Sequence, residues 1–327
     1  MNSSIGILTS EMSLCSTAIL FIVGPTAVGK TALAIRLAQR FSGEIVNADS
    51  RQVYRYMDIG TAKPTEAERA EVPHHLLDIL DPDQSFDLGS FLALARGVTR
   101  EIQGRGNLPI VVGGSGEYVR ALLEGWEVPQ APPDPDFRKA KLQEAERVGT
   151  LALHQELQGV DPQRASQLDA RNVRRVIRAL EIYHATGVPP SQYTQRGAPM
   201  AHSLIMGLTL DREELYRRID ARVERMVAEG LVDEAQWLQD MGYPLGHGPL
   251  ASVGYLEMGQ YLDDEVTLTE AVQRTKFHTH RLARRQYTWF KLDDPRIHWL
   301  DVSDPRLEEQ AVYLVRINPQ IAQISQK

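Results

Sequence analysis

Short apolar runs rich in strand-forming residues alternate with amphipathic stretches along the chain. The runs that predict buried strands are 18–23, 45–48, 109–112 and 203–210. Between the first two, residues 31–40 have apolar positions at helical spacing and end before Ser42-Gly43. Strands separated by helices predict an α/β fold with a parallel sheet.

A long helical pattern interrupts the strands, from about Phe137 to Thr186. It follows a segment, Val128 to Pro135, that contains four prolines and is typical of a stiff linker. The strand pattern then resumes, and Arg212 to Glu229 forms an amphipathic helix that ends at Gly230. We therefore expect a core of residues 17–128 and 201–315, a helical insertion at 129–200, and tails at 1–16 and 316–327.

Composition narrows the class of protein. The 43 acidic and 36 basic residues give a net charge of −7, so any nucleic-acid site must be a local basic patch. The single cysteine, Cys15, cannot form an internal disulfide, which is typical of a reducing compartment. The longest apolar run, 18–23, is too short to cross a membrane. We expect a cytoplasmic protein without membrane contact, and a monomer.

One glycine-rich segment matches the phosphate-loop pattern G-x-x-x-x-G-K-[ST] between a predicted strand and a predicted helix. Its residues are Gly24, Pro25, Thr26, Ala27, Val28, Gly29, Lys30 and Thr31. In such a loop, backbone N–H groups and the helix N-terminus hold an oligophosphate. Lys30 would neutralise the phosphates, and the Thr31 hydroxyl would be a ligand of Mg²⁺. The expected core is therefore like that of the P-loop NTPases, and the expected ligand is a di- or triphosphate.

A carboxylate, Asp49, follows the second predicted strand. The carboxyl ends of parallel strands meet at one edge of a sheet, so Asp49 would lie beside the bound phosphates. There it is suited to accept a proton from a nucleophile or to help order Mg²⁺; capping a helix is the alternative role. We expect no later strand to end in an acid, which favours group transfer over nucleotide hydrolysis.

A second glycine-rich turn, Gly113 to Gly116, follows the strand at 109–112. It would let the backbone and the Ser115 hydroxyl approach a ligand closely. A plain tight turn in which Ser115 caps a helix is the alternative.

Two basic stretches stand out from the acidic average. The first places four arginines, at 171, 174, 175 and 178, on one helical stripe. The second, Arg274 to Lys291, has six Lys or Arg, no acid, and interleaved aromatic residues. Basic groups with aromatic side chains are suited to hold a nucleic-acid backbone and to stack an unpaired base. Solvated helix faces are the alternative for both stretches.

Together these motifs resemble the bacterial tRNA dimethylallyltransferases, also called isopentenyl-diphosphate:tRNA transferases. The matching strings follow the order of the family along nearly the whole chain. They are GPTAVGKT at 24–31, NADSRQVYR at 47–55, MDIGTAKP at 57–64, VPHHL at 72–76, GGSGEY at 113–118, RRVIRALE at 174–181, VGY at 253–255 and RLARRQYTW at 281–289.

The family transfers the dimethylallyl group of dimethylallyl diphosphate to N6 of the adenosine just 3′ of the anticodon in certain tRNAs. The resemblance implies that Lys30, together with Mg²⁺ near Thr31, stabilises the charge that grows on the diphosphate as the allylic C–O bond breaks. It implies that Asp49 accepts the hydrogen of the adenine amine. Ser115, where threonine is common in the family, would bond the diphosphate or the amine. Arg222 matches a diphosphate-binding arginine, with a plain surface arginine as the alternative.

The resemblance also implies contacts with the tRNA anticodon stem-loop, whose target adenosine must leave its stack. The implied contacts with the tRNA are Asp49, Ser50, Arg51, Gln52, Ser115, Arg138, Arg174, Arg175, Arg178, Arg281, Arg284, Arg285 and Gln286. Of these, Gln52 is expected to contact an edge of the adenine or of a neighbouring base.

Two other functions remain open from the sequence. A small-molecule or nucleoside kinase would use the loop for ATP and Asp49 to activate an acceptor hydroxyl. An RNA-binding regulator would use a nucleotide as a switch. The two basic stretches count against the first, because a small acceptor does not need them. The acid at the reacting group counts against the second.

Overall fold

The computed structural model describes residues 18–129, 131–193 and 202–322, so the predicted tail at 1–16 lies outside it. Within these ranges the chain forms two compact units. The first comprises residues up to 85, 95–119 and 201 onward, and the second comprises 86–94 and 120–200. No helix in the described ranges is long and apolar enough to cross a membrane.

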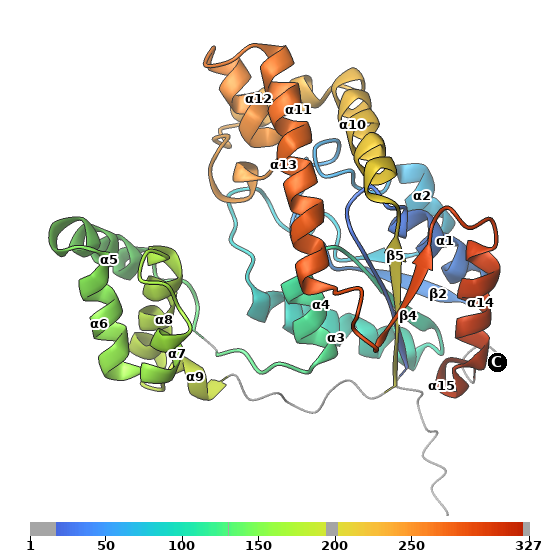
Figure 1. The fold of residues 1–327 in the computed structure, drawn as a ribbon, viewed down its shortest axis with the longest axis horizontal. Coiled ribbons are helices and arrows are strands. Elements are labelled where there is room, and N and C mark those ends of the chain that lie inside the picture. Colours follow the sequence, from blue (N-terminus) through green and yellow to red (C-terminus); the bar gives the residue numbers. More distant parts are fainter. Residues whose placement is uncertain (1–17, 130, 194–201, 323–327) are drawn as a thin grey trace, which may run out of the picture. The chain divides into compact units, whose positions relative to one another are not determined.

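The first unit is built on a parallel sheet (Figure 1). Its strands are β1 (Ile19–Val23), β2 (Gly43–Asn47), β3 (His74–His75), β4 (Leu108–Val112), β5 (Ser203–Thr209) and β6 (Ile297–Asp301). They lie in the order β3-β2-β4-β1-β5-β6, and every paired neighbour is parallel. The fold is therefore the predicted α/β class, with β1 in the middle of the sheet and the carboxyl ends of all the strands at one edge.

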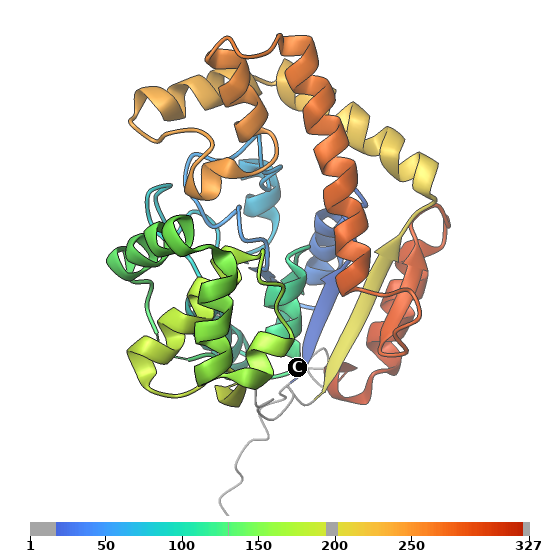
Figure 2. The ribbon, with the colours of Figure 1, turned by 60° about the vertical axis from the view of Figure 1, so that its left-hand side comes forward.

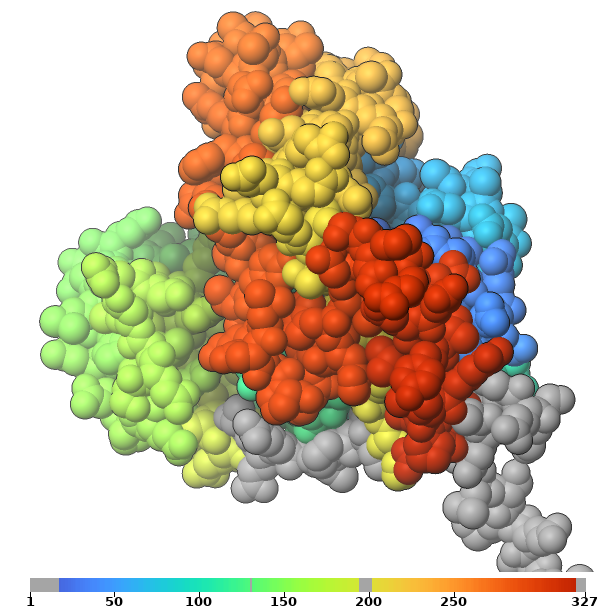
Figure 3. Space-filling model, turned by 45° about the vertical axis from the view of Figure 1, so that its right-hand side comes forward, coloured from blue at the N-terminus to red at the C-terminus, as the bar shows by residue number. Residues whose placement is uncertain are grey.

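Helices connect and cover these strands. Those of the first unit are α1 (Lys30–Arg40), α2 (Glu66–Glu71), α10 (Arg212–Ala228), α11 (Leu231–Asp240), the 3-10 helix η1 (Gly248–Ala251), α12 (Tyr255–Leu262), α13 (Leu268–Trp289), α14 (Leu307–Ile317) and α15 (Pro319–Ala322). The helices α3 (Leu88–Gly104) and α4 (Gly116–Leu123) each have residues in both units. The long helices α10 and α13 lie side by side (Figures 2 and 3).

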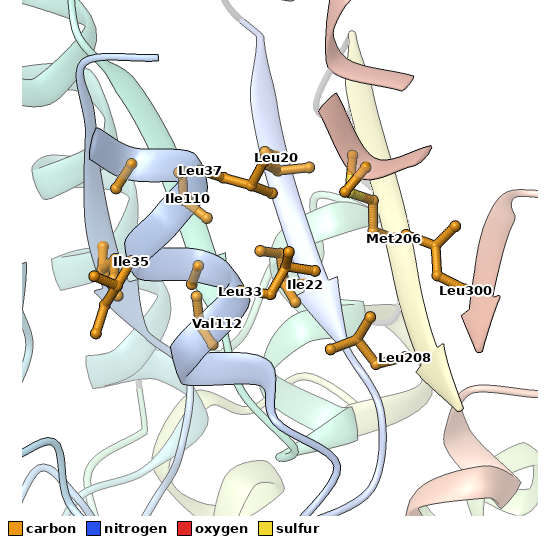
Figure 4. Close-up of a cluster of buried hydrophobic side chains, with 14 of the residues drawn as sticks. Leu20, Ile22, Leu33, Ile35, Leu37, Ile110, Val112, Met206, Leu208 and Leu300 are labelled. Carbon is orange, nitrogen blue, oxygen red and sulfur yellow. The ribbon is translucent and has the colours of Figure 1, made fainter. Parts of the chain in front are cut away.

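The core of the first unit lies between one face of the sheet and α1 (Figure 4). Leu20 and Ile22 of β1 point toward α1, where Leu33 and Leu37 are fully buried. Phe21, between them in sequence, points to the opposite face and is also fully buried. Burial on both faces explains why β1 is continuously apolar rather than alternating.

Described residues of the predicted tail at 316–327 contribute to this core, in contrast to the prediction. Val315 of α14 and Ile321 of α15 are both fully buried. The run from Leu307 to Ile317 has apolar residues at helical spacing, so the prediction ended the core too early.

The second unit is helical. It contains α5 (Pro135–Val148), α6 (Thr150–Val160), α7 (Pro162–Ser166), α8 (Val173–Thr186) and α9 (Pro190–Tyr193), which form a small bundle (Figure 2). Leu153 and Leu157 of α6 pack with Val176 and Leu180 of α8. Its boundary differs from the predicted insertion at 129–200, because residues 86–94 and 120–128 cluster with it. The chain therefore passes through this unit first at residues 86–94 and again from within α4, before the proline-rich linker.

A buried carboxylate, Glu44, stabilises the start of β2. It accepts hydrogen bonds from Arg105 at 2.8 Å, Asn107 at 2.7 Å and His75 at 2.7 Å. Burial raises the pKa of Glu44, but these donors outweigh burial and lower the pKa to about 2. A glutamate with a depressed pKa stabilises the fold above its unfolded-state pKa, and this contribution is lost as the pH falls toward 2.

Replacing Glu44 with glutamine is therefore expected to lower the free energy of unfolding by about 2 kcal/mol at neutral pH. The difference from the unchanged protein should shrink as the pH falls below the ordinary glutamate pKa. Urea denaturation at a series of pH values measures it, with the exposed Glu71→Gln as a control. A difference that stays constant with pH would contradict the charge-based explanation.

Candidate active site

The phosphate loop lies between β1 and α1, as predicted. Gly24 has a φ of 140°, and a Cβ there would lie 2.5 Å from the Leu208 carbonyl oxygen, so the position requires glycine. Gly29, with a φ of 99°, precedes the first residue of α1, and no acidic residue lies in the first turn of this described helix. The N–H groups at the start of α1 therefore face the loop without a competing carboxylate, which is the arrangement that binds anions.

Lys30 provides the positive charge of the loop. Its Nζ donates hydrogen bonds to the carbonyl oxygens of Gly24, at 3.0 Å, and of Pro25, at 2.7 Å. The pKa of Lys30 is lowered to about 8, because burial and, to a smaller extent, the Arg222 guanidinium lower it more than the Asp49 carboxylate raises it. Asp49 and Arg222 are thus within electrostatic reach of Lys30. The structure brings together three of the predicted residues, from α1, the segment after β2, and α10.

Arg222 faces this group from α10. Burial lowers its pKa, and so does the neighbouring Arg225. Among the described residues no ion pair is recorded for its guanidinium. A half-buried arginine for which no ion pair is recorded among the described residues is suited to bind an anion.

Hydrogen bonds with residues close in sequence hold Asp49 in place. The Asn47 side chain accepts a hydrogen bond from the Asp49 N–H at 3.0 Å and donates one to the Asp49 carbonyl at 3.1 Å. One carboxylate oxygen, Oδ1, accepts the Arg51 N–H at 2.9 Å. No hydrogen bond to a described residue is recorded for Oδ2. No helix begins at Asp49, since the next one starts at Glu66, so the alternative role as a helix cap does not apply.

Asp49 is not the last acid at this edge of the sheet, in contrast to the prediction. Asp211 follows β5, and β6 ends at Asp301. Asp211 accepts the N–H groups of Glu213 and Glu214 and so caps α10. Asp301 is exposed on the edge strand and accepts hydrogen bonds from Ser303. Both acids are engaged locally, so Asp49 remains the strand-end acid that faces Lys30.

Ser115 lies in the turn after β4, and its hydrogen bonds connect this turn to the segment that carries Asp49. Its Oγ accepts the Ser50 N–H at 3.0 Å, and its own N–H donates to the Ala48 carbonyl at 3.4 Å. A hydroxyl that accepts one bond keeps its own proton as a donor. The Ser115 O–H is therefore free to donate beside Asp49.

Gln286, predicted from the resemblance as a contact with tRNA, is buried against the phosphate loop. Its side chain is bonded to Thr26 and to Gly114, and only 6% of the residue is exposed. Sequence reasoning missed this contact, because nothing in the pattern of α13 shows which of its polar residues points inward.

Gln52 supports a loop that sequence reasoning also left unexplained. Its amide donates to the carbonyls of Thr61 and Ala62 at 3.1 and 3.2 Å. Glu234 of α11 binds the same loop. Its carboxylate accepts hydrogen bonds from the backbone N–H groups of residues 58, 59 and 60 and from the Tyr255 hydroxyl. The buried Lys63 pairs with Asp58 and Asp78. In the sequence, the feature that indicated this network was Lys63, the single lysine of the MDIGTAKP string.

The exposed face of α13 carries Arg281, Arg284 and Arg285. The Arg281 guanidinium lies over the ring of Phe277, 5.9 Å from its centre, and 55% of Phe277 is exposed. Basic groups and one exposed aromatic ring, that of Phe277, thus share one helix face. Ser50 and Arg51 are half-buried beside Asp49.

The predicted arginines of the second unit fall into two groups. Arg138 and Arg178 both pair with the buried Glu181, and these bonds lower the pKa of its carboxyl against the effect of burial. Arg174 and Arg175 are exposed on α8, and no ion pair is recorded for either among the described residues. Arg174 and Arg175 are therefore available to a polyanion, while Arg138 and Arg178 first serve the fold of this unit.

The site fits Mg²⁺ only together with a phosphate ligand. No group of three or more His, Cys, Asp or Glu in the described ranges could hold a metal ion. Mg²⁺ is usually held by one or two protein oxygens, substrate phosphates and water, and the half-buried Thr31 in the first turn of α1 offers one such oxygen. The donor set thus matches a metal that arrives with its phosphates.

A parallel sheet with a phosphate loop between its central strand β1 and the helix α1 defines a P-loop protein. The chain belongs to the IPP transferase family, whose family model matches residues 52–293. A second model, isopentenyl transferase, matches residues 17–79.

Relatives and solved structures agree with this assignment. The chain is 49% identical to a tRNA dimethylallyltransferase of Roseiflexus sp. (strain RS-1) over 90% of this chain and 96% of the relative. It is 52% identical to that of Thermomicrobium roseum over 83% and 82%. The crystal structure of a tRNA isopentenylpyrophosphate transferase from Bacillus halodurans is 41% identical, with a TM-score of 0.68 and coverage of 94% and 98%. A eukaryotic dimethylallyltransferase acting on tRNA is 29% identical, with a TM-score of 0.76 and coverage of 94% and 77%.

Proposed function

We propose that the protein transfers the dimethylallyl group of dimethylallyl diphosphate to N6 of the adenosine 3′ of the anticodon in tRNA. The products are N6-dimethylallyladenosine and diphosphate. The observation that carries the proposal is the electrostatic interaction of Lys30, in the phosphate loop after β1, with Asp49 after β2 and with Arg222 of α10. Two cations for a diphosphate and one carboxylate for an amine proton are what this reaction needs.

In the proposed reaction the adenine N6 attacks the allylic carbon, and the C–O bond to the diphosphate breaks. The phosphate loop, Lys30 and Arg222 bind the departing diphosphate and stabilise its growing negative charge. Thr31 would hold Mg²⁺ with the diphosphate oxygens, and the metal would supply further charge neutralisation. Asp49 accepts the proton from N6 through its free Oδ2, and Ser115 donates a hydrogen bond to the diphosphate or orients the amine.

The partner is the anticodon stem-loop of tRNA, with its adenosine turned out of the stack. We assign the phosphate contacts to the exposed arginines of α13 and to Arg174 and Arg175 of the second unit, and the base contacts to the segment from Asp49 to Gln52. We further propose that the protein works in the cytoplasm, as a monomer.

The kinase alternative shares the loop and the acid but leaves the basic face of α13 without a purpose. A direct test incubates the purified protein with an adenosine-bearing anticodon stem-loop, Mg²⁺ and either dimethylallyl diphosphate or ATP. Mass spectrometry of the nucleosides should detect a dimethylallyl group on adenosine only with the allylic donor. An unmodified stem-loop with consumption of ATP would favour the kinase.

A further inference from the structure

The side chain of Gln286 forms hydrogen bonds to two loops of the site that are far apart in sequence. Its Oε1 accepts the Thr26 N–H of the phosphate loop at 2.7 Å. Its Nε2 donates to the carbonyl of Gly114, in the turn that carries Ser115, at 3.1 Å. Both polar ends of the amide are therefore used inside the protein, and the residue is 6% exposed.

The turn after β4 is shaped to receive this face of α13. A Cβ at Gly114 would lie 2.0 Å from Gln286 Nε2, and a Cβ at Gly116 would lie 2.2 Å from Trp289 Cγ. Gln286 and Trp289 are three residues apart, so they share one side of the helix. The Tyr287 hydroxyl lies 3.0 Å from Thr209 Oγ at the end of β5, which fixes the same helical turn to a third strand end.

We infer that Gln286 is a positioning residue of the transfer site, and this inference rests on the proposed function. It holds the start of the phosphate loop and the Ser115 turn in one arrangement, so that the diphosphate subsite is formed before the donor binds. The Gln286 side chain is bonded to Thr26 and Gly114 and is 6% exposed, so RNA on the surface of α13 would not contact it. The expected defect of a Gln286 variant is therefore in donor binding and not in RNA binding.

The test measures the affinity for inorganic diphosphate and for the anticodon stem-loop separately, by calorimetry. Gln286→Met keeps the length of the side chain but removes both bonds, and we expect diphosphate affinity to fall about tenfold while RNA affinity stays within about twofold. In the transfer assay the KM for the allylic donor should rise and the KM for the stem-loop should not.

A second variant, Gly114→Ala, disturbs the contact between Gln286 and Gly114 by a change at Gly114. Gly114→Ala would push the Gln286 amide away, so its loss of diphosphate affinity should not add to that of Gln286→Met in the double variant. Thr288→Val, on the exposed side of the same helical turn, is the control that should bind diphosphate normally. Thermal unfolding of each variant identifies any that does not fold.

Three results would overturn the inference: a folded Gln286→Met that binds diphosphate as the unchanged protein does, one that loses RNA affinity instead, or losses that add fully in the double variant. The last would mean that the two substitutions act independently. If the unchanged protein binds no diphosphate at all, the proposed function itself fails, and the two failures are thereby distinguished.

Discussion

Replacing Asp49 with asparagine is expected to lower turnover by about 10³-fold, while the affinities for donor and stem-loop change by less than about threefold. The substitution keeps the size of the side chain and an oxygen that can accept the Arg51 N–H, so the local turn remains. What is lost is the charge and basicity of Oδ2, which accepts the N6 proton in the proposed reaction. Single-turnover kinetics with saturating donor and stem-loop measure the chemical step directly.

Asp301→Asn is the matched control for Asp49→Asn, because it removes another acid at the end of a strand of the same sheet. Its carboxylate is exposed and bonded to Ser303, so turnover should be unchanged. Asn47→Ala should give an intermediate loss, since the Asn47 side chain holds the Asp49 backbone from both sides. An Asp49→Asn variant that turns over normally would exclude this carboxylate as the proton acceptor.

The fold could be predicted where a local pattern has one physical meaning. The continuously apolar run of β-forming residues before Gly24 predicts a strand buried on both faces, and the phosphate-loop pattern that follows predicts a helix after it. Asp49 and Ser115 could be placed at the same edge because parallel strands bring their carboxyl ends together. The edge strand β3 has only two residues and β6 has mixed burial, so neither gave a clear signal.

The remainder of the site depends on which side of a helix faces inward, and the sequence of a basic helix does not determine that. Arg285 and Gln286 are neighbours in α13, yet the first is exposed and the second is buried against the phosphate loop. The same limit applies to α8, where Arg175 is exposed but Arg178 is paired with Glu181. Tertiary packing decides each case, so a basic stretch predicts a binding face but not its individual contacts.

Replacing Lys30 with methionine is expected to reduce kcat/KM for the donor by about 10³-fold, since it removes a half-buried charge that faces the leaving diphosphate in the proposed reaction. The methionine also leaves the carbonyls of Gly24 and Pro25 without the donor that joins them, so the loop becomes less ordered. Affinity for the stem-loop alone should not change. Initial rates at low donor concentration, together with stem-loop binding, separate the two effects.

Lys30→Arg retains the charge and so tests whether charge alone is sufficient. We expect it to recover little activity, because a planar guanidinium on a longer stem cannot reproduce one Nζ placed between two loop carbonyls at 3.0 and 2.7 Å.

Arg222→Gln removes the second cation, which α10 provides. It should reduce kcat/KM by about 10²-fold, less than Lys30→Met, because the loop amides remain ordered. Equal losses for the two variants would contradict this division of roles, and near-normal rates for Lys30→Met would exclude the phosphate loop as the binding site of the leaving group.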